Sequence, residues 1–279
     1  MFRSSVTPKQ FEYVRKYFPV VKCTRPKKYT DYDMFSGLLY VLCNGTKWRE
    51  LPSCFPPWKS VYWFMTKLIG NHTLDIILRL LSTLERECRD IPLTQRHILI
   101  TDTKSVRTTC YTNKKYTGYD GHKKIKGMKL CLLCDTSGNI WNCRTAPANT
   151  AEREKIKNQV IWYTTMKAHN QVFTVLLADK GYESKKLIQA LKNYKITLYP
   201  MKSTKWIKHT TTIPSNKEQK DMLTYFNKQI SKLRYVVERT FGWIDTCRRV
   251  IVCYERKARR YEEFVKLALV RILLKRLVK

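Results

Sequence analysis

The chain has 279 residues, of which 54 are Lys or Arg and 22 are Asp or Glu, so its formal net charge is +32. Hydrophobic residues make up 43% and aromatic residues 12%, enough for a packed core, which excludes a chain that is disordered over its whole length. The length predicts two domains, or one large domain with a small addition. So large a surplus of cations indicates a polyanionic partner, with nucleic acid favoured over an anionic membrane.

Two further features concern the compartment. No run of about 18 apolar residues occurs, and the first residues lack the apolar stretch of a signal peptide, so we expect a cytoplasmic protein with no membrane partner. The ten cysteines are scattered, which favours free thiols over disulfides. Cys131 and Cys134 form the one C-x-x-C pair, and burial as small hydrophobic residues is favoured over zinc binding because no second pair follows at zinc spacing.

The first 95 residues carry helical patterns. Thr7 to Gln10 read as a capping box with Pro8 at the first helical position, which predicts a helix to about residue 18. Further helices are predicted at 31–43, 58–69 and 73–88. Residues 1–95 are therefore expected to be a separate helical module.

The module resembles a helix-turn-helix unit, in which the third helix would contact DNA through Trp58 and Lys59. The connection 44–56 is longer than the usual tight turn. Packing of Trp58 into the core is the alternative interpretation.

From residue 97 the pattern changes to strands. Apolar runs predict strands at 97–106, 129–135, 140–145, 172–179 and 196–202. Helices are predicted at 149–166 and 183–194, from 221 through 244 and from 261 onward, with a basic loop at 203–219. Three antiparallel strands followed by parallel β-α-β units predict a mixed α/β sheet in residues 96–279.

Three carboxylates are predicted to lie where they could form one site. Asp102 and Asp179 each end a buried apolar run, and open α/β sheets hold ligands beyond the carboxyl ends of their strands. Glu238 follows Val237 at the border of a buried helical stripe, so it can reach toward both aspartates if the first and fourth strands are neighbours. Oxygen ligands of this kind suit Mg²⁺, and a pair of such ions promotes in-line phosphodiester displacement.

Each carboxylate also has a simpler interpretation. An aspartate at a strand end is often a cap or the partner of a lysine, and lysines are abundant in this chain. Asp245 lies seven residues after Glu238 on the same helical face, where a solvated polar role is favoured.

Long motifs resemble the DDE transposases of bacterial insertion sequences, in the insertion-sequence-five family. The helical part resembles that family in RPKKYTDYDMFSGLLYVLCNGTKWRELPSCFPPWKSVYWFMTKL, and the remainder in ITDTKSVRTT, GYDGHKKIKGMKLCLLCDTSGN, LADKGY and YVVERTFGWIDTCRRVIVCYER. The resemblance implies an RNase H-like fold in which Asp102, Asp179 and Glu238 are the catalytic triad and hold Mg²⁺, with Mn²⁺ as a substitute. The letters VVERTF match one subgroup of the family best.

One signature of the family is matched only in part. Arg234 fits the Arg of the pattern Y-x2-R-x3-E-x6-K, whereas Ser231 and Asp245 stand at the Tyr and Lys positions. Arg248 and Arg249 are interpreted as the local basic substitutes.

Basic residues around the acidic site are expected to contact DNA phosphates. They are Arg107, Lys123, Lys124, Lys126, Arg234, Arg239, Arg248 and Arg249. A solvated lysine-rich loop is the alternative for the three lysines, and residues 275–279 are expected to be a solvated end.

The resemblance implies a transposase that binds the terminal inverted repeats of its element, cleaves phosphodiester bonds at the ends and joins the 3′-hydroxyls to target DNA. Pairing of two ends implies a homodimer or a higher assembly, at work on double-stranded DNA of the bacterial nucleoid. A nuclease of the same fold is one alternative, and a transposase-derived DNA-binding protein without turnover is another.

Overall fold

The computed structural model describes residues 6–19, 27–89, 91, 96–151, 156–158, 160, 174–182, 184–201 and 232–278. Its first helices are α1 (Pro8–Arg15), α2 (Asp31–Asn44), α3 (Trp58–Gly70) and α4 (Thr73–Cys88), with the short 3-10 helix η1 (Trp48–Glu50) between α2 and α3. The capping box is confirmed, since Gln10 N donates to Thr7 Oγ1 over 3.2 Å while Thr7 N donates to the Gln10 side chain over 2.9 Å. Gly45 ends α2 in the left-handed conformation that glycine adopts without strain.

A mixed sheet follows the helices. Its strands are β1 (Ile98–Thr108), β2 (Gly118–Asp120), β3 (Ile125–Asp135), β4 (Ile140–Pro147), β5 (Val175–Asp179), β6 (Thr197–Met201) and β7 (Val252–Cys253). The other elements are the 3-10 helices η3 (Lys114–Tyr116) and η4 (Lys180–Tyr182), the helices α6 (Lys185–Lys192), α8 (Arg248–Ile251) and α9 (Ala258–Leu277), and a helix over 232–245, here called the 232–245 helix.

The order of the strands confirms the predicted mixed sheet. β1 pairs antiparallel with β3, and β3 pairs antiparallel with β4, whereas β5 pairs parallel with β1 on one side and with β6 on the other. Three antiparallel strands followed by two parallel ones are the arrangement expected of an RNase H-like sheet. The strands β2 and β7 were not predicted, because runs of three and two residues are too short to show an alternating pattern.

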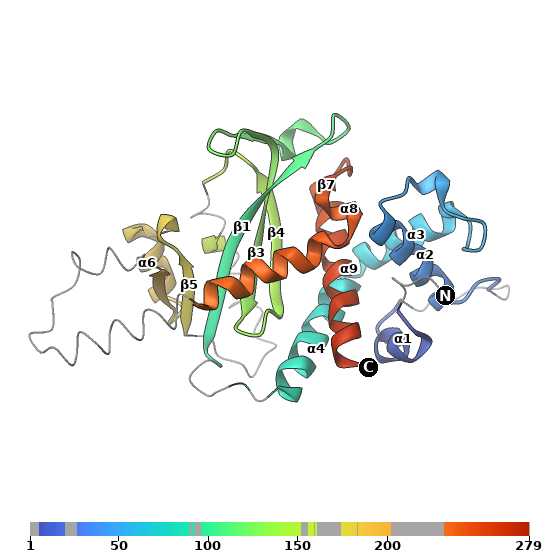
Figure 1. Cartoon of the computed structure of the whole chain (residues 1–279), viewed down its shortest axis with the longest axis horizontal. Coiled ribbons are helices and arrows are strands. Elements are labelled where there is room, and N and C mark those ends of the chain that lie inside the picture. Colours follow the sequence, from blue (N-terminus) through green and yellow to red (C-terminus); the bar gives the residue numbers. More distant parts are fainter. Residues whose placement is uncertain are drawn as a thin grey trace, which may run out of the picture.

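Helices cover both faces of the sheet. Along β1, Ile100 and Val106 pack with Val237 and Phe241 of the 232–245 helix and with α9. On the other face, Leu99 packs with residues of α6. In Figure 1 the 232–245 helix, drawn in orange, crosses in front of the sheet toward α8. We call the face that it covers the front face.

The N-terminal helices share the core of the front face. Buried residues of α1 to α4 belong to the same hydrophobic cluster as β1, β3 and α9. The helix α4 lies against both α9 and β4, where Ser82 Oγ donates to Ile140 O over 3.2 Å and Lys266 Nζ donates to Asp75 Oδ2 over 2.8 Å. The division into modules at residues 1–95 and 96–279 stays a prediction, and the described residues on its two sides pack closely.

Two predicted boundaries were wrong. The strand β1 continues to Thr108, so Asp102 lies in its middle and not at its end. The last helix begins at Ala258, three residues before the predicted start. Most of the predicted helix at 149–166, the basic loop at 203–219 and the first part of the helix predicted from 221 lie outside the described residues.

Candidate active site

Asp102 and Asp179 lie on neighbouring strands and on the same face. Ile100 of β1 stands beside Leu177 of β5, so two residues further along each strand Asp102 comes level with Asp179. Side chains alternate along a strand, which turns both aspartates to the face of Ile100 and Leu177, the front face. The strands that carry Asp102 and Asp179 are neighbours, which is the condition under which Glu238 was expected to reach both aspartates.

The third carboxylate comes from the 232–245 helix, which packs on the front face. Arg234 Nε lies 3.1 Å from Glu238 Oε1, and Arg234 NH1 lies 3.5 Å from Asp179 Oδ1. These three side chains are 44 to 51% exposed, so the cluster opens to solvent. Arg234 therefore stands between two of the three predicted acids and balances their charge.

A second ion pair fixes the same helix to β1. Asp245, one residue after Ile244 of the core, pairs with Lys104 of β1. The expectation of a solvated role for Asp245 was wrong, since a lysine 141 residues earlier meets it across the front face. The pair holds the helix that carries Glu238.

Burial raises the pKa of Asp102, and the nearby negative charge of Asp179 raises it further. The backbone N–H of Thr103, which donates to Asp102 Oδ1 over 2.7 Å, and the cations of Arg234 and Lys123 act in the opposite direction. The Asp102 carboxylate therefore lies in a site that disfavours its negative charge, and a nearby cation would stabilise that charge.

The donor set fits a divalent metal in its chemistry. Carboxylate oxygens are the ligands that Mg²⁺ and Mn²⁺ prefer, and two of them stand level on adjacent strands. Within the described part of the chain, no three His, Cys, Asp or Glu side chains are close enough to hold a metal ion. Glu238, the third predicted ligand, is paired with Arg234 in this structure.

Two residues that sequence reasoning left without a role support the site. The hydroxyls of Thr103 and Tyr182 lie 3.1 Å apart and both side chains are buried. Tyr182 ends the motif LADKGY, so this hydrogen bond ties the segment after Asp179 to the residue after Asp102. The motif was visible in the sequence, but the partner 79 residues away was not.

The expected DNA-contact residues of the β2–β3 hairpin are exposed. Lys123, Lys124 and Lys126 are all at the surface, as is Arg107 near the end of β1. Lys123 is the lysine among them whose charge lowers the pKa of Asp102. Asp120 shapes the turn, because its Oδ1 accepts the backbone N–H groups of His122 and Lys123, each over 3.1 Å.

Arg249 departs from its expected role. Its side chain is buried, NH2 lies 2.6 Å from Glu255 Oε1, and NH1 donates to Thr46 O over 3.3 Å. A guanidinium that pairs with a buried carboxylate is not presented to DNA. Arg248, its neighbour, is exposed.

The remaining predicted contacts lie on two helices. Arg239 stacks on Trp243, 4.7 Å from the ring centre, and NH2 donates to Ser137 O over 3.4 Å. Trp58 is half-buried at the start of α3, beside exposed Lys59.

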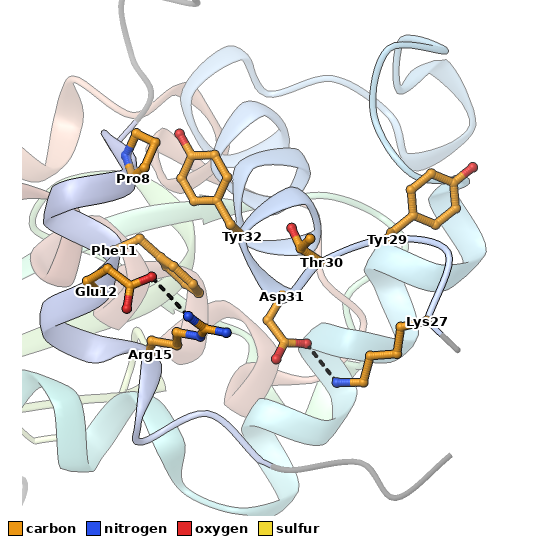
Figure 2. Close-up of a pocket in the computed structure, with 9 residues that line it drawn as sticks. All are labelled: Pro8, Phe11, Glu12, Arg15, Lys27, Tyr29, Thr30, Asp31 and Tyr32. Carbon is orange, nitrogen blue, oxygen red and sulfur yellow. Dashed lines mark hydrogen bonds and ion pairs between the residues drawn. The ribbon is translucent and has the colours of Figure 1, made fainter. Parts of the chain in front are cut away.

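Three further features within the described residues carry no sign of a site. A cavity of about 410 Å³ lies between α1 and the start of α2. In it Glu12 pairs with Arg15 and Lys27 pairs with Asp31, so its charges cancel (Figure 2). Cys131 and Cys134 form no disulfide and are buried in β3, as expected of small core residues. No helix in the described ranges is long and apolar enough to cross a membrane.

The mixed sheet with two aspartates level on its front face defines the class, an RNase H-like protein with an acidic site. Residues 93–273 match the family described as the transposase DDE domain, and residues 6–78 match the family described as a transposase of the IS4/5 family. The chain belongs to the DDE transposases of the IS4/5 type and is a metal-dependent DNA transposase. Membership of the VVERTF subgroup stays a prediction.

Solved structures give distant similarities. The catalytic domain of Mos1 mariner transposase is 13% identical over 61% of this chain and 89% of that one, with a TM-score of 0.28. A piggyBac transposase synaptic complex with hairpin DNA is 13% identical over 64% of this chain and 46% of that one, with a TM-score of 0.37. These TM-scores are too low to support the fold assignment, which rests on the strand order of this chain. No curated protein matches the chain.

Proposed function

We propose that this transposase binds the terminal inverted repeats of its own insertion sequence, hydrolyses the phosphodiester bonds at the element ends and joins the freed 3′-hydroxyls to target DNA. The observation that carries the proposal is the pair Asp102 and Asp179, level on adjacent strands of the front face under the helix that bears Glu238. The family match supports a transposase reaction for this chain.

We propose Asp102, Asp179 and Glu238 as the ligands of the metal, Mg²⁺ with Mn²⁺ as a substitute. When bound, the metal supplies Lewis-acid activation of water or of a 3′-hydroxyl and stabilises the leaving oxygen. The raised pKa of Asp102 supports the assignment, because a group that carries its negative charge at a cost in the free protein gains most from an added cation.

The chain's own residues position the DNA around this site. Lys123, close enough to Asp102 to lower its pKa, is proposed to hold a phosphate of the strand that is cut. Arg234 is proposed to release Glu238 and Asp179 and to turn its guanidinium to a neighbouring phosphate. The protein contributes no covalent nucleophile in this scheme, since water and then a DNA 3′-hydroxyl attack.

Two ends of one element have to be brought together before they are joined to a target. We therefore propose a homodimer or a higher assembly on paired ends, acting in the bacterial cytoplasm at the nucleoid.

Assays of cleavage and of strand transfer on a labelled terminal repeat with Mg²⁺ test the function. Wild type is compared with Asp102→Ala, and with Glu12→Gln as a control in which an exposed acid of α1 is changed. We expect cutting and joining by wild type and by the control, and neither by Asp102→Ala.

The alternatives give other results in the same assay. Cutting without joining would favour a nuclease of the same fold. DNA affinity without cutting under any divalent metal would favour a transposase-derived binding protein. Metal-dependent cutting that persists in Asp102→Ala would overturn the triad.

A further inference from the structure

A strongly basic cavity of about 370 Å³ lies where α4, the 232–245 helix and α9 end near one another. We call it the basic pocket. It is lined by Arg89, Arg239, Trp243, Thr246, Arg271, Ile272, Lys275 and Arg276, which include five cations and no acid. The sequence favoured a solvated end for residues 275–279, whereas Lys275 and Arg276 are partly buried here.

Two carboxylates near the pocket oppose part of its positive charge. Glu85 of α4 is buried and pairs with both Arg276 and Arg89, the latter over 2.5 Å, and the charge of Asp135 also acts on Arg276. Arg271 and Lys275 add like charges one turn apart on α9. The pocket therefore keeps a net positive charge.

Two cations of the pocket share the same contacts. Arg239 and Arg276 both stack on Trp243, 4.7 and 5.0 Å from its ring centre, and both donate to the carbonyl oxygen of Ser137. In the described structure, Nε of Arg239 and NH1 of Arg276 are buried without a hydrogen-bond partner. Two guanidinium groups are thus fixed in place with part of their hydrogen-bonding capacity unused.

Burial disfavours the charged forms of two cations in the pocket. It lowers the pKa of Arg276, although the charge of Glu85 acts in the opposite direction. Burial also lowers the pKa of Lys275, and the like charge of Arg271 adds to this effect. A bound anion would offset both costs.

We propose that the basic pocket binds a backbone phosphate of DNA, as a contact separate from the acidic site; this rests on the proposed function, in which DNA is the substrate. A phosphate suits guanidinium groups, which bind its oxygens in pairs. The indole ring of Trp243 is already stacked against two guanidinium groups, so it is not available to stack on a base. The pocket therefore suits an anion.

The position of the pocket favours a polymer over a free ion. Glu238 and Trp243 are five residues apart on one helix, about 7.5 Å along its axis and about 140° around it. The acidic site and the pocket therefore lie on different sides of one helix. A strand that follows the helix surface from one side to the other has phosphates spaced closely enough to meet both, which a free ion cannot do.

The test uses the full chain with Arg271→Gln and Lys275→Gln, singly and together. The matched control is Lys9→Gln with Lys16→Gln, which removes two exposed charges from the region of α1. Binding of a labelled terminal-repeat duplex is measured at several salt concentrations by fluorescence anisotropy. Thermal unfolding of each variant, with and without inorganic phosphate, is measured alongside.

We expect the double variant to bind DNA about tenfold more weakly and the slope of log affinity against log salt to fall by about 0.9, the value for one phosphate. Lys275→Gln should unfold at the same temperature as wild type or higher, because it removes a like charge beside Arg271. Inorganic phosphate should stabilise wild type more than the double variant.

Other outcomes overturn the proposal in distinguishable ways. Affinity and slope equal to those of the control would remove the pocket from the DNA contacts while leaving the proposed function intact. Loss of the phosphate response alone would identify a site for free phosphate and contradict the DNA assignment. A reduced slope in a protein that never cuts would uphold the pocket and overturn the proposed function, and a wild type without DNA affinity would overturn both.

Discussion

At the scale of single residues, the acidic site is balanced by a cation of the protein itself. Arg234 bridges Asp179 and Glu238, which gives these carboxylates a counter-charge before any metal arrives. A metal that gathers all three acids has to compete with this guanidinium.

Arg234→Gln should therefore strengthen binding of Mn²⁺ by about two- to fivefold, the range that partly exposed ion pairs contribute, while it weakens binding of the terminal repeat. Isothermal titration with Mn²⁺ measures the first effect. The exposed Arg248→Gln is the control and should leave Mn²⁺ affinity unchanged. Weaker Mn²⁺ binding in Arg234→Gln would show that Arg234 supports the metal site and does not compete for it.

Arg248 and Arg249 are adjacent in sequence and differ in burial. Arg249→Ala leaves Glu255 buried without its partner, which should cost about 3–5 kcal/mol of unfolding free energy. Arg248→Ala removes an exposed side chain and should change stability by less than about 0.5 kcal/mol. Urea unfolding of the two variants measures the difference, and equal stabilities would contradict the buried ion pair.

The stability of the protein is expected to depend on pH through Asp120. The Ser105 hydroxyl bond, with the backbone bonds and Lys129, lowers the pKa of Asp120 below the ordinary 3.8. Stability from this carboxylate is present above the unfolded pKa and is lost as pH falls through the folded one. Asp120→Asn should thus cost about 1–3 kcal/mol at pH 7, and the gap to wild type should narrow near pH 3. Urea unfolding at both values tests this, and a gap independent of pH would contradict it.

At the scale of elements, long periodic runs were predicted well and contacts between distant segments were not. The strands β3 and β4 show apolar runs, and the helix α6 has a serine cap. Signals of this kind lie within one segment and are visible without knowledge of the fold. The position of Asp102 was misjudged because an aspartate after an apolar run looks like a strand end, although pairing with β3 continues to Arg107. Arg249 was misjudged because a local cluster of arginines does not show which of them meets Glu255 inside the protein.

The packing of α4 is testable by a pair of substitutions on one helix. Leu81 is fully buried in the shared core, whereas Ile76 is 48% exposed. Leu81→Ala should lower the free energy of unfolding by about 2–5 kcal/mol, and Ile76→Ala by less than about 1 kcal/mol. Chemical denaturation measures both, and a Leu81→Ala protein as stable as wild type would contradict the docking of α4 on α9.

At the scale of the whole molecule, several acids pair inside the protein, so they do not compensate the exposed cations that contribute to the net charge of +32. Several of the 22 acids are buried among internal partners, including Glu85, Asp135, Glu255, Glu262 and Glu263. Acids that face inward leave the exposed lysines and arginines without local compensation, which suits a long polyanion. The composition alone indicated the partner, and the structure shows how the charge is distributed.

The central claim is that Asp102, Asp179 and Glu238 together hold the catalytic metal. Titration with Mn²⁺, followed by the electron paramagnetic resonance signal of the free ion, tests it without relying on DNA cleavage. We expect Asp102→Asn, Asp179→Asn and Glu238→Gln each to weaken Mn²⁺ binding by about tenfold or more, whereas Glu12→Gln should bind Mn²⁺ as wild type does. Unchanged Mn²⁺ binding in all three variants would show that these carboxylates do not hold the metal.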